Sequence, residues 1–191
     1  METKPRGVES IPESDRAALL RIARDAIVAH VRREPAPLPQ IAESLSWPAG
    51  AFVTLHRRGA LRGCIGRLEA DQPVARVVAH CAVAACSQDP RFLPVTAEEL
   101  HDLDIELSIL GPIEPVAHLE EIEVGRHGVI IERGVHRGLL LPQVAVEWKW
   151  DRTKFVEETC RKAGLPRDAW HAGAAMSKFE AEVFNDQKLH P

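Results

Sequence analysis

The residues best suited to chemistry in this chain are Leu-Arg-Gly-Cys-Ile-Gly at positions 61–66. Glycine tolerates positive φ and close backbone approach, so Gly63 and Gly66 predict a tight bend that holds Cys64 beside backbone amides. Thiolates form more readily near cations, from a free pKa of about 8.5. Four arginines surround the motif and predict a positively charged loop: Arg57, Arg58, Arg62 and Arg67. The candidate binding residues here are Arg62, Gly63, Cys64, Ile65 and Gly66.

Cys64 is also a candidate nucleophile, because it alone among four cysteines falls outside the predicted helices. A nucleophile needs a base within reach, and His56 could lie across a hairpin from it. The alternative is a small residue that merely fits a tight hairpin. The phosphate-loop pattern G-x-x-x-x-G-K-[ST] is absent, so an anion held by the Arg62 guanidinium is the better-founded ligand.

Asp89-Pro90-Arg91-Phe92 is the second candidate site. Proline fixes the backbone while Asp89, Arg91 and Phe92 present a carboxylate, a guanidinium and an aromatic ring. The alternative is an Asp–Arg pair that braces a loop, with Phe92 in the core. His127, at the start of a predicted hairpin, is a third candidate binding residue. No histidine or cysteine spacing typical of a metal site appears, and we expect neither a metal nor a cofactor.

Hydrophobic periodicity predicts the elements that position these residues. Ser14 is a candidate cap for a helix that runs to about Arg33, and Asp151 caps another that Gly164 ends. Short connections favour antiparallel pairing, hence an α+β fold with a mixed or mostly antiparallel sheet and flanking helices. The remaining expected elements are a hairpin around 51–66, a helix over 73–86, a short helix over 96–101, a strand over 103–110, a hairpin over 127–141 and a strand over 177–184.

Length and composition indicate an ordinary globular protein. With 191 residues, of which 45% are hydrophobic, we expect a flexible arm at 1–13 and a single domain at 14–191. The net charge of −4 makes nucleic acid an improbable partner. No apolar run reaches the ~20 residues that span a bilayer, so we expect no membrane association and a cytoplasmic location.

The motif at 61–66 resembles the signature of the AMMECR-domain family, whose microbial members are called AmmeMemoRadiSam system protein A. The resemblance covers roughly 14–184 and continues through 89–92, 103–110, 127–128, 140–143, 150–151 and 160–165. Arg67 departs from it, since many relatives carry a small polar residue there. The resemblance implies two lobes with a cleft near the motif. It also implies a Memo-like protein and a radical S-adenosylmethionine enzyme as partners.

These observations predict a binding or accessory protein of a modification system. It would recognise a protein segment or a small anionic ligand through the glycine-cysteine motif. The alternative is an enzyme that uses Cys64 as nucleophile or acyl acceptor. The chain holds no C-x-x-x-C-x-x-C run, so any radical chemistry would belong to a partner.

Overall fold

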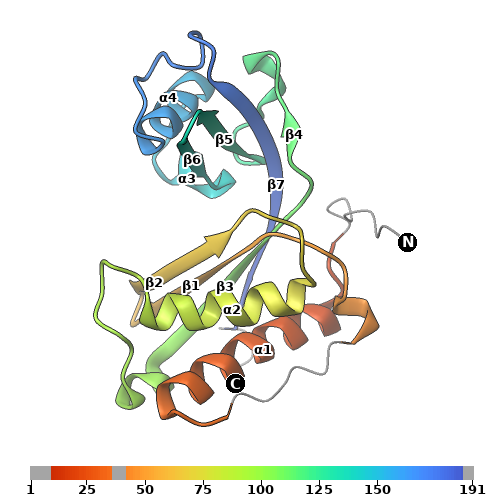
Figure 1. Cartoon of the computed structure of the whole chain (residues 1–191), viewed down its shortest axis with the longest axis vertical. Helices are drawn as coiled ribbons and strands as arrows, with labels where there is room; N and C mark the ends of the chain where they lie inside the picture. Colours follow the sequence, from red (N-terminus) through yellow and green to blue (C-terminus); the bar gives the residue numbers. More distant parts are fainter. Residues whose placement is uncertain (1–9, 36–41, 187–191) are drawn as a thin grey trace. The chain divides into compact units, whose positions relative to one another are not determined.

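The computed structural model describes residues 10–35 and 42–186, which fall into two compact units (Figure 1). Unit 1 comprises the chain up to Leu110 and from Glu182 onward, and unit 2 comprises Gly111–Ala181. Residues 1–9 of the predicted N-terminal arm lie outside the described residues. The helices and strands of unit 1 are α1 (Glu13–Arg32), η1 (Glu43–Leu45), β1 (Ala51–Arg57), β2 (Ala60–Arg67), α2 (Val74–Ser87), η2 (Ala97–Asp102) and β3 (Leu103–Leu110).

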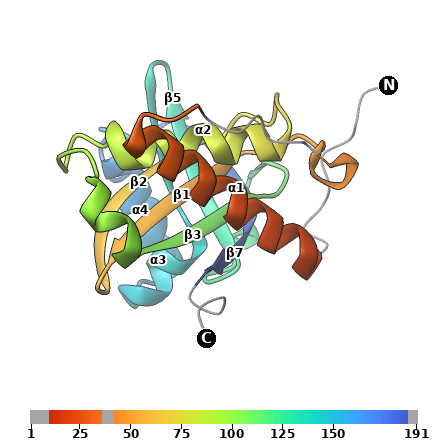
Figure 2. The ribbon, with the colours of Figure 1, turned by 90° about the horizontal axis from the view of Figure 1, so that it is seen from below.

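Unit 1 is an antiparallel sheet with two helices on one face (Figure 2). β1 lies between β2 and β3, and alternate residues of β1 (Ala51, Val53 and Leu55) are buried. Alternation places every second side chain on the same face, so these residues meet α1 and α2 and form the core. The other sheet face carries the intervening side chains, which include Thr54 and Cys64.

The two long helices follow from their apolar stripes. α1 buries Leu19, Ala23 and Ile27 at helical spacing, and α2 buries Val74, Val78 and Cys81 in the same way. α1 has Pro12 at its N-cap without a side-chain bond, so the predicted Ser14 cap is wrong. Proline supplies a preset φ there, and the helix begins one residue earlier than Ser14.

Unit 2 is a second antiparallel arrangement with its own core. Its sheet order is β4-β7-β5-β6, and the predicted hairpin over 127–141 is confirmed, with Gly134 at the turn (φ 62°). The α4 cap is also confirmed, since the Asp151 carboxylate accepts from Lys154 N at 2.8 Å. The elements are β4 (Glu114–Pro115), η3 (Leu119–Glu121), β5 (His127–Arg133), β6 (His136–Leu140), α3 (Pro142–Glu147), α4 (Arg152–Lys162) and β7 (Ala175–Asn185).

β7 belongs to both units. Residues 175–180 pair with β5 in unit 2, whereas residues 182–185 belong to unit 1, where β7 neighbours β3. Just past β7, the Asp186 carboxylate accepts from Ile105 N at 2.9 Å and pairs with Arg24. The two ends of unit 2 adjoin, because Gly111 N donates to Glu180 O at 2.9 Å.

The fold class is therefore confirmed as α+β with an antiparallel sheet. The cleft between two lobes stays a prediction. No helix in the described part of the chain is both long enough and apolar enough to span a membrane.

Candidate functional site

The motif at 61–66 lies within strand β2, so the predicted bend is wrong. The hairpin expected around 51–66 is confirmed, and its turn lies at Arg58 and Gly59, whose φ values are 51° and 79°. The two motif glycines are required for close approach. A Cβ on Gly63 would lie 2.3 Å from the Ala85 carbonyl oxygen, and one on Gly66 would lie 2.2 Å from the Phe52 ring. Both contacts are far inside van der Waals distance, so any side chain would displace α2 or Phe52.

Cys64 is half-buried and has defined partners on the strand beside it and in the turn after α2. Register places Thr54 opposite Cys64, and the Thr54 hydroxyl donates to the sulfur at 3.3 Å. The backbone N–H of Cys64 donates to the Asp89 carboxylate at 2.8 Å. Ile65, the next motif residue, is half-buried and packs on the unit 1 core. The two motifs found in the sequence thus meet at one place.

Asp89 is the buried centre of this site. Its carboxylate accepts from Arg91 N at 3.1 Å, Nε at 2.9 Å and Nη2 at 2.6 Å, besides the Cys64 amide. The hydrogen-bonded Arg91 guanidinium, with help from the amides, holds the pKa of Asp89 far below its usual range. The low pKa keeps Asp89 ionised near neutral pH and makes it a weak base.

Arg62 is tied to the segment that follows the Asp89 turn. Its guanidinium makes two parallel bonds of 2.9 Å to Glu99, and Nη1 donates to Leu93 O at 3.0 Å. The hydrogen bonds from Arg62 lower the pKa of Glu99 to about 2. Glu99 also forms a capping box with Thr96. Charge and hydrogen bonding of this kind fix Arg62 in place.

Phe92 lies near two guanidinium groups instead of filling the core. The guanidinium carbons of Arg62 and Arg91 are 5.9 Å and 5.5 Å from its ring centroid. The ring is half-buried, and the next residue, Leu93, is exposed. The bracing Asp–Arg pair is present as expected, but the expected core position of Phe92 is wrong because two cations hold the ring.

The positive loop expected from the sequence is neutral in the structure. Each arginine near the motif meets a carboxylate, and five arginines match five carboxylates. The carboxylates come from segments beyond the motif, which explains why the local sequence suggested a net charge. The pairs join Arg57, Arg58, Arg62, Arg67 and Arg91 to Glu69, Asp71, Asp89, Glu99 and Asp102.

His127 belongs to unit 2, and its contacts are within that unit. Its Nδ1 accepts from Glu123 N at 2.9 Å, and its Nε2 lies 4.0 Å from Glu180. Burial, assisted by the nearby cations Lys178 and Arg126, lowers the pKa of His127. These contacts are those of a neutral structural histidine, and they do not link His127 to Cys64.

The other three cysteines are buried, as their helical positions predict for Cys81 and Cys160. Burial raises the pKa of Cys81 and that of Cys86 to about 11. In the described residues, no group of three or more histidine, cysteine or acidic side chains is arranged to hold a metal ion. Cys64 is thus the half-exposed thiol of the described chain.

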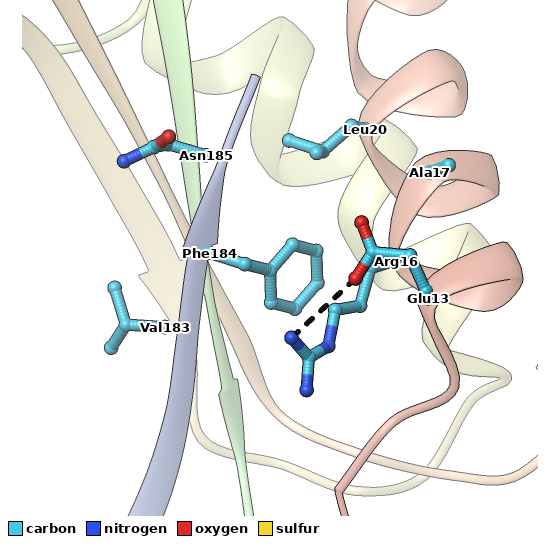
Figure 3. Close-up of a pocket in the computed structure, with 7 residues that line it drawn as sticks. All are labelled: Glu13, Arg16, Ala17, Leu20, Val183, Phe184 and Asn185. Carbon is cyan, nitrogen blue, oxygen red and sulfur yellow. Dashed lines mark ion pairs between the residues drawn. The ribbon is translucent and has the colours of Figure 1, made fainter. Parts of the chain in front are cut away.

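Sequence reasoning missed Thr54 and the Arg62–Glu99 pair. The alternation of apolar and polar residues in 51–57 places Thr54 on the open sheet face, but only the register brings it to Cys64. The structure also has a cavity of about 260 Å³ that the sequence did not suggest, between α1 and β7 (Figure 3). Arg16 and Phe184 line it, with the guanidinium carbon 5.9 Å from the ring centroid.

Fold and site together define an α+β protein whose edge strand carries a half-buried cysteine between glycines. A family model described as AMMECR1 matches residues 20–184, and the chain belongs to this family. It is similar to a protein of Methanothermobacter thermautotrophicus, at 43% identity over 88% of this chain and 92% of the relative. It is also similar to Protein PF1979 of Pyrococcus furiosus, at 43% identity over 88% of this chain and 87% of that protein.

A solved structure gives the same result. The crystal structure of the uncharacterized protein PH0010 from Pyrococcus horikoshii matches with a TM-score of 0.83 and 41% identity. The match covers 88% of this chain and 90% of that chain. The family recognised from the motif at 61–66 is therefore confirmed.

Proposed function

We propose that this protein is a cytoplasmic binding or accessory component of a modification system, and that it recognises a protein segment at the site around Cys64. The observation that carries the proposal is the bond from the Cys64 amide to Asp89 at 2.8 Å. It joins the two sequence motifs into one surface. That surface presents a half-buried thiol, a half-exposed guanidinium and an aromatic ring on a rigid strand and a braced turn.

A protein segment fits this surface better than a small anion does. The Arg62 guanidinium, which the sequence suggested as the anion holder, is 15% exposed and already holds Glu99 through two bonds. A small anion would have to displace a carboxylate that is hydrogen-bonded and partly desolvated. Aromatic and arginine side chains, by contrast, are enriched where proteins contact proteins.

The alternative function, catalysis by Cys64, has weaker support. The hydrogen bond recorded for its sulfur in the described chain comes from Thr54, a hydroxyl that is a poor base. Asp89, the acid bonded to the Cys64 amide, is a weak base because its pKa lies far below the usual range. An activated nucleophile usually has an adjacent base with an orienting partner.

A binding experiment with purified components tests the proposal. The resemblance to the family suggests a Memo-like protein and a radical S-adenosylmethionine enzyme from the same organism as partners. We expect one of them to bind with a Kd of micromolar order, and Phe92→Ala to weaken it about tenfold, or 1.4 kcal/mol. Arg76→Glu, on the exposed face of α2, is the control. Failure of both proteins to bind at about 100 μM would count against the proposal.

Thiol labelling separates binding from catalysis. If Cys64 only binds, its labelling rate between pH 5 and 9 should follow that of free cysteine or be slower. A rate at neutral pH well above that of free cysteine, lost in Cys64→Ser, would favour the nucleophile instead.

A further inference from the structure

We propose that the outer edge of β2 from Cys64 to Gly66 takes an extended peptide as an added strand, with an acidic residue toward Arg91 and a basic residue toward Asp71. This inference rests on the proposed recognition of a protein segment and specifies how the segment binds. Added strands gain affinity from main-chain bonds and specificity from the flanking side chains.

β2 is the outermost strand of the unit 1 sheet. The sheet order places β1 on one side of β2 and no strand of the described chain on the other. Edge strands present a row of backbone N–H and C=O groups that can pair with another chain. Natural proteins often block such edges with lysine or proline, and β2 contains neither.

The hydrogen bond of the Cys64 amide indicates which backbone N–H and C=O groups of β2 point away from β1. This N–H donates to Asp89, so it points away from β1 and the Cys64–Thr54 pair is of the non-hydrogen-bonded type. N–H and C=O of one residue point the same way in an antiparallel ladder, and residues two apart share that direction. The C=O of Cys64 and both groups of Gly66 therefore face outward.

The outer edge of β2 is blocked up to the Cys64 amide and is open from the Cys64 carbonyl to Gly66. A register irregularity at Leu55 and His56 disturbs pairing near Arg62, and the Asp89 turn covers the Cys64 amide. For the three outward groups from Cys64 C=O to Gly66 C=O, the described chain records no bond from a loop, cap or side chain. Gly66 is half-exposed, and its missing Cβ leaves the Phe52 ring beside the edge as an apolar surface.

The charges along this edge are arranged with opposite signs at its two ends. At the start of the motif, the most exposed arginines of the ion pairs are Arg58 and Arg91, whose side chains are 76% and 54% exposed. Beyond Gly66, Arg67 faces two exposed carboxylates, those of Glu69 and Asp71. The exposed side chains are thus arginines at one end and carboxylates at the other, and Asp71 is 59% exposed while its partner Arg67 is 27% exposed. Complementary charge sets partner choice and orientation.

Peptide selection followed by backbone methylation tests the inference. A displayed random library of about seven-residue peptides is panned on the full chain, since strands average about five to six residues. We expect selected peptides to carry one acidic and one basic residue. N-methylation should weaken binding more than tenfold at alternate positions and leave the intervening ones unchanged. That period of two is specific to strand pairing.

Charge reversal gives the second measurement. Asp71→Lys, at an exposed position that folding tolerates, should lower the affinity for the selected peptide about fivefold. A peptide whose basic residue is changed to an acidic one should bind Asp71→Lys with the original affinity. Arg91→Glu should weaken binding through the acidic residue of the peptide, whereas Arg76→Glu should not.

The outcomes separate this inference from the proposed function. If the partner protein binds and depends on Phe92 but no peptide is selected, or methylation shows no period of two, strand addition is wrong and segment recognition survives. If neither partner nor peptide binds, both are wrong. Equal binding by wild type and Asp71→Lys would overturn the assigned orientation.

Discussion

Replacing Asp89 by asparagine should destabilise the protein more than the same change at an exposed carboxylate. The carboxylate is buried and accepts four hydrogen bonds, from Cys64 N and from three groups of Arg91. Asparagine keeps one acceptor oxygen for the Cys64 amide, but it places an NH₂ group against the guanidinium. The change therefore removes the ion pair and sets the NH₂ donors of asparagine against the N–H donors of Arg91.

The magnitude follows from the bonds lost. Hydrogen bonds to charged groups contribute about 1.5–3 kcal/mol each when buried. The Asp89–Arg91 pair should contribute less to stability, because the Arg91 side chain is 54% exposed and solvent screens it. We expect Asp89→Asn to lower the free energy of unfolding by about 2 kcal/mol at pH 7. Arg91→Ala should cost a similar amount, about 2 kcal/mol, since it leaves a buried carboxylate with backbone donors alone.

Urea unfolding followed by fluorescence between pH 3 and 7 is the assay. The folded-state pKa of Asp89 is depressed, so its contribution is complete above the unfolded value of about 3.9 and is lost as pH falls toward the folded value. The difference in free energy of unfolding between wild type and Asp89→Asn should therefore decrease as the pH drops below about 4.

A matched control shows whether the stability cost comes from the burial of the carboxylate or from its pairing with an arginine. Asp71→Asn removes a carboxylate that also meets an arginine, Arg67, but at an exposed position, and should cost about 0.5 kcal/mol or less. Equal costs for Asp89→Asn and Asp71→Asn, or a gap that does not change with pH, would refute the central role given to Asp89.

Three further predictions concern the same strand. Glu99→Gln should cost about 1–2 kcal/mol at pH 7, and this cost should fade from pH 4.5 to about 2, since pairing with Arg62 lowers the pKa of Glu99 to about 2; a pH-independent cost would contradict the pairing. Gly63→Ala should lower stability by about 2–3 kcal/mol in urea titration, because its methyl group would lie 2.3 Å from Ala85 O; a near-neutral result would mean that α2 shifts freely. In native protein one thiol, Cys64, should react with a disulfide reagent, and the three buried thiols only on unfolding; reaction of all four without unfolding would contradict their burial.

Much of the fold follows from periodicity in the sequence. The alternation over 103–110 predicts strand β3 with the bounds that the structure has, because one face is buried and the other is polar. The six-residue helix α3 after Pro142 was not predicted, since so short a segment carries no periodic signal. The strand at 61–66 was interpreted as a bend because its glycines favour turns, but pairing with β1 overrides that local preference.

The candidate site was predictable as parts but not as a whole. Cys64 and Asp89 were each singled out, yet the bond between them joins residues 25 positions apart. Arg62 and Glu99 are 37 positions apart, so the neutral charge of the site depends on tertiary contacts that composition does not encode. Local spacing identified the chemical groups, and the antiparallel register decided which of them meet.

The division of β7 between the two units determines the order in which a growing chain can complete them. Every residue of unit 2 leaves the ribosome before Glu182 does, so Gly111 can meet Glu180 once that residue has emerged. Unit 1 must wait for its last strand and for Asp186, although its first hundred residues are made earliest. A chain truncated before Glu182 would thus contain a complete unit 2 within an incomplete unit 1. Ile105 and Arg24 would then lack the Asp186 carboxylate that binds both of them.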